Sequence, residues 1–199
     1  MVVSQPEFLS LTNEWYGTFL RKPEDDITRV VSFEVANCAE LLSSSWANEE
    51  LADKNGRQLL FELFYLYTHL LSRTAFDLFG HEFRCELQNR LANTCLPMFV
   101  YVVMPPDIST EKQREVSERF YSGLNETELL YGGKSKATDW DTKGVFSDEA
   151  VLPTFARRVS ALLGRPHNPA TIIEVQILLA GSIRNASLDS LVTCAKENT

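Results

Sequence analysis

The sequence predicts an all-α protein, a single domain of six to eight helices packed around one very apolar central helix at about residues 57–79. Along most of the 199-residue chain, apolar residues recur three and four positions apart, which is the period of one face of a helix. Between Leu59 and Phe79, 14 of the 21 residues are apolar and six of those are aromatic, as expected for a helix buried on nearly all sides. A chain of this length can enclose one sizeable core.

Two helices are expected before the central one. The first begins at a capping box formed by Ser4 and Glu7. The second opens at Pro23, where the following acidic residues suit the positive end of the helix dipole. Its apolar face also contains Glu34, which is therefore expected to point toward the core. The central helix follows, and Gly80 is expected to end it as a left-handed stop.

Beyond Gly80, a further helix from Glu82 should bury Phe83, Leu87 and Leu91 on one side. The short apolar run Met98–Met104 is bounded by prolines, so a buried strand remains an alternative to helix there.

Four more segments complete the predicted chain. Ser109 or Thr110 caps a helix that ends near Tyr131, and breakers and small polar residues predict a flexible loop at about 132–146. Ser147 is expected to cap a helix through residue 163. The last two helices are predicted at about residues 169–183, with Asn168 as the N-cap, and 188–196.

Composition narrows the classes of partner and compartment. The formal net charge of −8, from 27 acidic and 19 basic residues, opposes binding to nucleic acid or to anionic lipid. The four cysteines are scattered without a CxxC pair, as is typical of reduced thiols in the cytoplasm. The beginning of the sequence has no secretory signal, and its longest apolar run is too short for a membrane span. We therefore expect a cytoplasmic protein that binds neither nucleic acid nor membrane.

A stripe of four polar residues along the central helix is the strongest candidate site. Glu62, His69, Arg73 and Asp77 fall along one narrow line. Glu62 and His69 start about 10 Å apart along the axis, so the stripe cannot hold one metal ion by itself. His69 with Arg73, and Arg73 with Asp77, are neighbours at four-residue spacing. The simplest interpretation is a structural polar seam or a solvated edge, with an Arg73–Asp77 ion pair.

A functional interpretation of the stripe needs side chains from other helices. Glu34 and Glu174 both lie among apolar residues and could converge on Glu62 and His69 as a ligand-binding site. Helical di-metal sites require two Glu-x-x-His elements, and the residues three positions after these glutamates are Asn37, Tyr65 and Ile177. Gly132-Gly-Lys-Ser135 lacks the first glycine of a phosphate-binding loop. No catalytic residue, metal or cofactor is therefore predicted.

Three segments and one tyrosine carry a resemblance to other proteins. They are His69-Leu-Leu-Ser-Arg-Thr-Ala-Phe76, Gly80-His-Glu-Phe-Arg84, Phe120-Tyr-Ser-Gly-Leu-Asn-Glu126 and Tyr131. Over about residues 61–131 the chain resembles uncharacterised all-helical bacterial proteins. The resemblance implies no activity, and it favours His69, Arg73 and Gly80 acting as one unit.

Two functions follow as hypotheses. The first is a non-enzymatic binding or interaction protein, with a protein partner or a second copy of the chain contacting apolar helix surface such as that near Trp15 and Trp46. This hypothesis follows from the supply of aromatic residues and the absence of a recognisable catalytic motif. The alternative is a small-ligand-binding protein or an enzyme with an interior polar site around His69 and Arg73.

Overall fold

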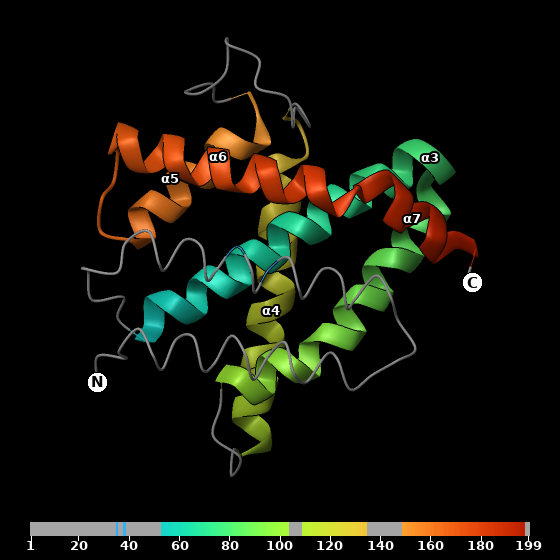
Figure 1. Cartoon of the computed structure of the whole chain (residues 1–199). Coiled ribbons are helices and arrows are strands. Elements are labelled where there is room, and N and C mark those ends of the chain that lie inside the picture. The colour runs from blue at the N-terminus through green and yellow to red at the C-terminus, as the bar shows by residue number, and fades with distance from the viewer. Residues whose placement is uncertain (1–34, 36–37, 39–52, 104–108, 135–148, 198–199) are drawn as a thin grey trace.

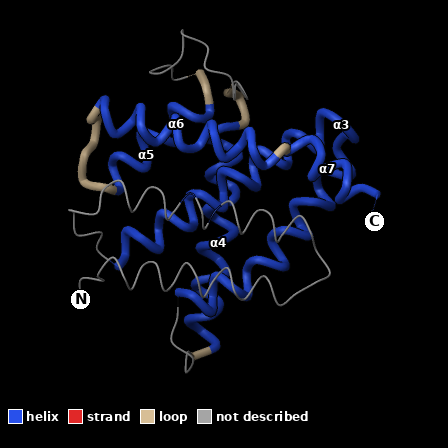
Figure 2. Tube along the Cα trace, viewed as in Figure 1, coloured by secondary structure: helices blue, strands red, loops and turns tan. Residues whose placement is uncertain are grey.

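The computed structural model describes residues 35, 38, 53–103, 109–134 and 149–197. Within these ranges every regular element is a helix (Figure 2). The prediction of an all-α protein is confirmed for this part of the chain. The described ranges contain five helices, labelled α3 to α7, which is fewer than the six to eight predicted. The predicted helix from Ser4 lies outside the described residues. Of the predicted helix from Pro23, only Val35 and Cys38 are described, and both are helical and buried. Glu34, Trp15 and Trp46 lie outside the described residues.

The longest element, α3, spans Asp53–Val103 and bends sharply at Gly80 (Figure 1). Gly80 has φ 82° and ψ −171°, a conformation that is essentially restricted to glycine. The expectation that the central helix ends at Gly80 is therefore confirmed, because two helices meet at a kink at this residue. The ψ of Gly80 differs from that of a left-handed cap, and the chain resumes its helical course after the bend. We call residues 53–79 the first arm of α3 and residues 81–103 the second arm.

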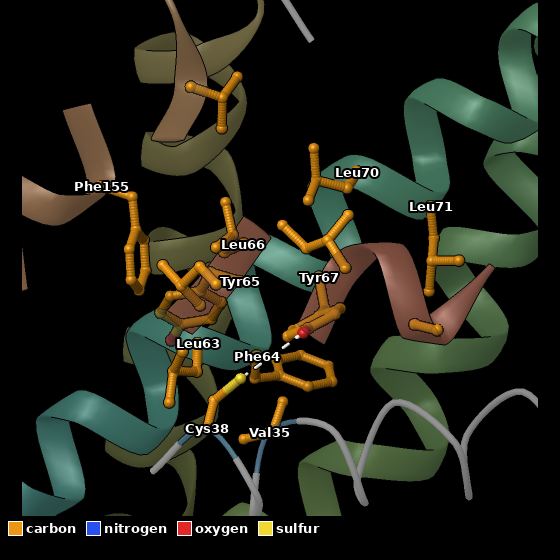
Figure 3. Close-up of a cluster of buried hydrophobic side chains, with 14 of the residues drawn as sticks. Val35, Cys38, Leu63, Phe64, Tyr65, Leu66, Tyr67, Leu70, Leu71 and Phe155 are labelled. Carbon is orange, nitrogen blue, oxygen red and sulfur yellow. Dashed lines mark hydrogen bonds between the residues drawn. The ribbon is translucent and has the colours of Figure 1, made fainter. Parts of the chain in front are cut away.

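The first arm of α3 is the centre of the core, as the sequence predicts. From Leu59 to Ala75 every side chain is buried except the half-buried Phe61 and Arg73. Tyr67 connects this arm to other parts of the chain through its hydroxyl group, which lies 2.6 Å from Oγ of Ser182 and 3.7 Å from Sγ of Cys38. Figure 3 shows Cys38 and Tyr67 among the buried side chains around Phe64.

The second arm of α3 buries the three residues that the pattern predicts. Phe83, Leu87 and Leu91 are 4 % exposed or less. The backbone remains helical through Val103, which confirms helix rather than strand for the described part of the proline-bounded apolar run. None of the described helices is both long enough and apolar enough to cross a membrane.

Helix α4 spans Thr110–Tyr131 and packs closely against α3. Ser109 is its N-cap, because the Ser109 side chain accepts a hydrogen bond from the backbone N–H of Lys112. Gly123 lies directly against the ring of Tyr65, and a Cβ atom at position 123 would come within 2.5 Å of that ring. A residue without a side chain therefore sets how closely α3 and α4 approach.

The remaining helices are α5, Val151–Leu162, α6, Pro169–Ala186, and α7, Leu188–Glu197. Asn168 caps α6, as predicted, by accepting from the backbone N–H of Thr171. Helix α5 begins at Val151, four residues after Ser147, which lies outside the described residues together with most of the predicted loop. Helix α5 packs on α6 and α3, while α7 packs beside the bend in α3 (Figure 1).

Candidate functional site

The structure separates the four residues of the predicted stripe by their exposure. Glu62 and His69 are buried, with 4 % and 1 % exposure, whereas Arg73 is half-buried and Asp77 is exposed. The stripe therefore runs from the core to the surface as the first arm of α3 approaches its bend. The two buried residues belong to different polar clusters. Glu62 pairs with a residue of α5, and His69 pairs with a residue of α4.

His69 pairs with a carboxylate that comes from α4. Its Nδ1 lies 2.9 Å from Oε1 of Glu128. The same carboxylate receives hydrogen bonds from Arg84, whose Nη2 lies 2.6 Å from Oε2, and from Nε2 of Gln88 at 3.2 Å. Arg84 also donates through Nε to Oγ of Ser72. We call Ser72, His69, Arg84, Gln88 and Glu128 the Glu128 cluster.

The Glu128 cluster spans the bend in α3. His69 and Ser72 lie on the first arm, while Arg84 and Gln88 lie on the second. Burial alone would raise the pKa of Glu128, but the hydrogen bond and charge of His69 and the positive charges of Arg84 and Arg73 outweigh it, so the pKa of Glu128 lies below its ordinary value. The carboxylate is therefore charged at neutral pH and holds both arms of α3 to α4.

Glu62 belongs to a second cluster, between α3 and α5. Its Oε1 lies 2.6 Å from Nη2 of Arg158 and accepts a hydrogen bond from Nε2 of Gln58 at 3.1 Å. Burial tends to lower the pKa of Arg158, but the hydrogen bond and negative charge of Glu62 raise it overall. A buried carboxylate next to an arginine that cannot lose its proton is a structural ion pair.

Arg73 donates a hydrogen bond through Nη1 to the backbone carbonyl oxygen of Lys134, just beyond the end of α4. This bond satisfies a backbone acceptor in the turn that follows α4. The Arg73–Asp77 ion pair inferred from the sequence stays a prediction. So does convergence with Glu34, which is outside the described residues, and with Glu174, which lies half-buried on α6.

Sequence reasoning missed Glu128 and Arg158, the two partners of the buried stripe residues. Glu128 carried a signal, because it lies four residues after Leu124 and three before Tyr131, both on the apolar stripe of α4. An acidic residue inside an apolar stripe needs a buried partner. Arg158 carried a similar signal, because it lies three residues after Phe155 and four before Leu162 in the middle of α5.

In the Glu128 cluster, the carboxylate of Glu128 orients the imidazole of His69. When Nδ1 of a neutral imidazole donates to the carboxylate, its Nε2 keeps a lone pair that can accept a proton or a hydrogen bond. Within the described ranges, no three His, Cys, Asp or Glu side chains gather closely enough to hold a metal ion. The arrangement therefore fixes the orientation of the His69 imidazole through Nδ1.

Comparison with known proteins adds no assignment: no family model, no curated protein and no solved structure matches this chain.

Proposed function

We propose that the protein is a non-enzymatic binding protein that contacts another protein, or a second copy of itself, through apolar surface at the bend of α3. The observation that carries the proposal is the exposure of Phe76, Leu78 and Phe79, which are 49 %, 46 % and 40 % exposed. We call these three residues the kink patch. Single exposed apolar residues are ordinary, but here three large ones lie within four positions, and Phe76 and Phe79 share one face of the helix. Clustered exposed apolar groups are typical of interaction sites.

The surroundings of the kink patch support the same function. Asp77, His81 and Glu82 are exposed in the same stretch of the chain, so apolar side chains are interspersed with polar ones, as at a protein interface. The charged residues of the interior, in contrast, are engaged within the chain, where Glu62 pairs with Arg158 and Glu128 with Arg84. Polar contacts inside the fold and apolar groups outside it favour binding over catalysis.

We also propose that the whole chain forms a single bundle of six to eight helices. The protein is cytoplasmic, and its partner is not nucleic acid. The net charge of −8 supports the last point, because phosphate backbones repel an acidic protein.

The test compares the full chain with the double variant Phe76→Ser/Phe79→Ser. Sedimentation velocity over the micromolar range measures self-association, and affinity capture with the purified protein as bait identifies any other partner. Aromatic residues at the centre of an interface often contribute about 2 kcal/mol each, so the double variant should weaken association at least tenfold.

Leu129→Ser is the matched control, because Leu129 is 87 % exposed on α4 and its replacement removes a similar apolar group. It should leave association unchanged. Thermal unfolding of each variant checks that the fold is retained, since Phe79 contacts Phe83 at a centroid distance of 5.4 Å. A wild-type chain that is monomeric and captures no partner, or equal effects of both variants, would contradict the proposal.

A further inference from the structure

The exposed charge around the kink patch is acidic. Between residues 74 and 89, the charged side chains that are exposed are Asp77, Glu82 and Glu86. The one arginine in this stretch, Arg84, is half-buried and donates hydrogen bonds to Glu128 within the fold. The surface at the bend is therefore both apolar and negatively charged.

These acidic residues lie close to the apolar groups of the kink patch. Asp77 lies within the patch in the sequence, and Glu82 follows Phe79 by three residues, so the Cα atoms of Glu82 and Phe79 are at most about 11 Å apart. The rings of Phe79 and Phe83 are in contact, with centroids 5.4 Å apart, which places the start of the second arm beside the patch. Charges about 10 Å apart still interact at 0.1 M ionic strength. A partner that covers the patch therefore meets these carboxylates.

The nearest basic groups that the structure describes do not cancel this negative charge. Nζ of Lys196, near the end of α7, lies 4.7 Å from the centre of the Phe83 ring, and the next residue, Glu197, is acidic and exposed. On the first arm, Arg73 donates to the backbone carbonyl oxygen of Lys134. Among the described residues at the bend, the charge balance at the surface therefore stays negative.

This charge distinguishes between the two kinds of partner that the proposed function leaves open. In a symmetric dimer the same surface of one copy meets that of the other, so the acidic side chains of both copies would be brought together. Like charges brought together across an interface oppose association. A different protein, whose apolar groups are flanked by lysine or arginine, matches both the apolar patch and its charge.

We propose that the kink patch binds a basic amphipathic segment of another protein. The apolar side chains of that segment contact Phe76 and Phe79, and its lysine or arginine side chains pair with Glu82 and Glu86. Such a partner buries exposed apolar surface and gains electrostatic attraction at the rim of the same contact. This inference rests on the proposed function, because it assigns a partner to the same surface.

The experiment uses two synthetic amphipathic peptides with leucine and phenylalanine at the same positions, spaced for one face of a helix. One peptide has lysine at its polar positions and the other has glutamine. Fluorescence anisotropy with the full-length protein measures the dissociation constant of each. We expect the lysine peptide to bind about tenfold more tightly than the glutamine peptide in 0.1 M salt. The difference should fall to about twofold or less in 1 M salt, where charges are screened beyond about 3 Å.

Glu82→Gln/Glu86→Gln should weaken binding of the lysine peptide about three- to tenfold, the combined effect of two exposed ion pairs, and should leave the glutamine peptide unaffected. Glu111→Gln/Glu115→Gln is the matched control, because these two residues are also exposed and four positions apart. They lie at the beginning of α4, and Glu111 is about 25 Å along that helix from Glu128, which contacts both arms of α3. The control removes the same net charge and should weaken binding less than twofold.

The variant Phe76→Ser/Phe79→Ser separates this inference from the proposed function. It should weaken the lysine peptide at least tenfold, and unchanged binding would overturn the inference. If this variant loses association while the wild type binds both peptides equally, the proposed function stands and the basic partner is overturned. Failure of the lysine peptide to bind, or equal weakening by the two glutamate double variants, would also overturn it. So would self-association of the wild type through the kink patch, because the partner would then be a second copy.

Discussion

At the scale of single residues, Glu128 has the most consequential environment among the polar side chains of α3 and α4. Its carboxylate accepts hydrogen bonds from Arg84 and Gln88 and pairs with Nδ1 of His69. A half-buried charge is tolerated only when nearby groups compensate it. One side chain of α4 therefore satisfies polar groups from both arms of α3.

Replacing Glu128 with glutamine should lower the free energy of unfolding at pH 7 by about 2 kcal/mol, because charge-assisted hydrogen bonds to Arg84 become neutral ones. The pKa of Glu128 is lowered in the folded protein, so its contribution is complete above its ordinary value of 4.5 and is lost as the pH falls through the lower folded value. Urea denaturation at pH 7 and at steps below pH 4.5 should show the difference from wild type shrinking with acid.

Glu126→Gln provides the control for this measurement, because Glu126 is exposed on the same helix and accepts from the Ser122 hydroxyl. Its effect should stay within about 0.5 kcal/mol at every pH. A deficit in Glu128→Gln that persists unchanged in acid would show that the charge of Glu128 is not what stabilises the cluster.

The sequence predicted the stripe but not the residues that complete it. Spacing along one helix identifies neighbours at three and four positions, but it left open whether the stripe is a buried seam or a solvated edge. The structure buries Glu62 and His69 and exposes Asp77. The partners Glu128 and Arg158 lie 59 and 96 positions away along the chain. Which helix faces which depends on packing between helices, and the pattern of a single helix carries no information about it.

At the scale of secondary-structure elements, α3 shows how one glycine separates two helices that both follow a regular apolar period. Apolar residues follow the helical period on both sides of Gly80, and both segments are helices. A glycine inside such a pattern is compatible with a stop or with a bend. Periodicity and the glycine therefore predicted both arms and the break between them, but not the direction in which the second arm leaves the kink.

Gly80→Ala should destabilise the protein by about 1–3 kcal/mol, because φ 82° with ψ −171° is unfavourable for any residue with a Cβ atom. The cost comes from the backbone alone, since an added Cβ would meet no atom within 4 Å. Thermal or urea denaturation measures it.

Gly181→Ala makes the same chemical change in an ordinary helical position of α6, where the added Cβ also meets nothing within 4 Å. That substitution should stabilise the protein by about 0.5–1 kcal/mol through helix propensity. Opposite signs for the two variants are expected, and a neutral or stabilising Gly80→Ala would contradict the strain assigned to the bend.

At the scale of the whole molecule, the described helices are joined by polar contacts that cross the apolar core. Glu62 and Arg158 connect α3 to α5, and the hydroxyl groups of Tyr67 and Ser182 connect α3 to α6. The all-α class followed from periodicity because it depends on local pattern alone. These connections could not be predicted from periodicity, because each joins residues that are remote in sequence.

Arg158→Ala should cost about 3 kcal/mol, because it leaves the carboxylate of Glu62 buried without its positive partner. Urea denaturation followed by far-ultraviolet circular dichroism measures the change. Replacing both partners, as Glu62→Leu/Arg158→Leu, should recover most of the loss, since no uncompensated charge then remains.

Arg114→Ala is the matched control, because Arg114 and Glu118 form a pair in which both side chains are at least 70 % exposed. Exposed pairs contribute little, so this variant should unfold like the wild type. If the double leucine variant were as unstable as Arg158→Ala, lost packing rather than an uncompensated charge would be the cause.

The bend at Gly80 also makes the position of the far end of α3 depend strongly on the angle between its two arms. From Gly80 to Val103 the second arm is about 35 Å long at 1.5 Å per residue. A rotation of about 10° at the glycine would therefore displace its far end by about 6 Å. The Glu128 cluster constrains this angle, because it joins residues from both sides of the bend to the same carboxylate. Loss of these bonds would therefore remove one constraint on the angle between the two arms.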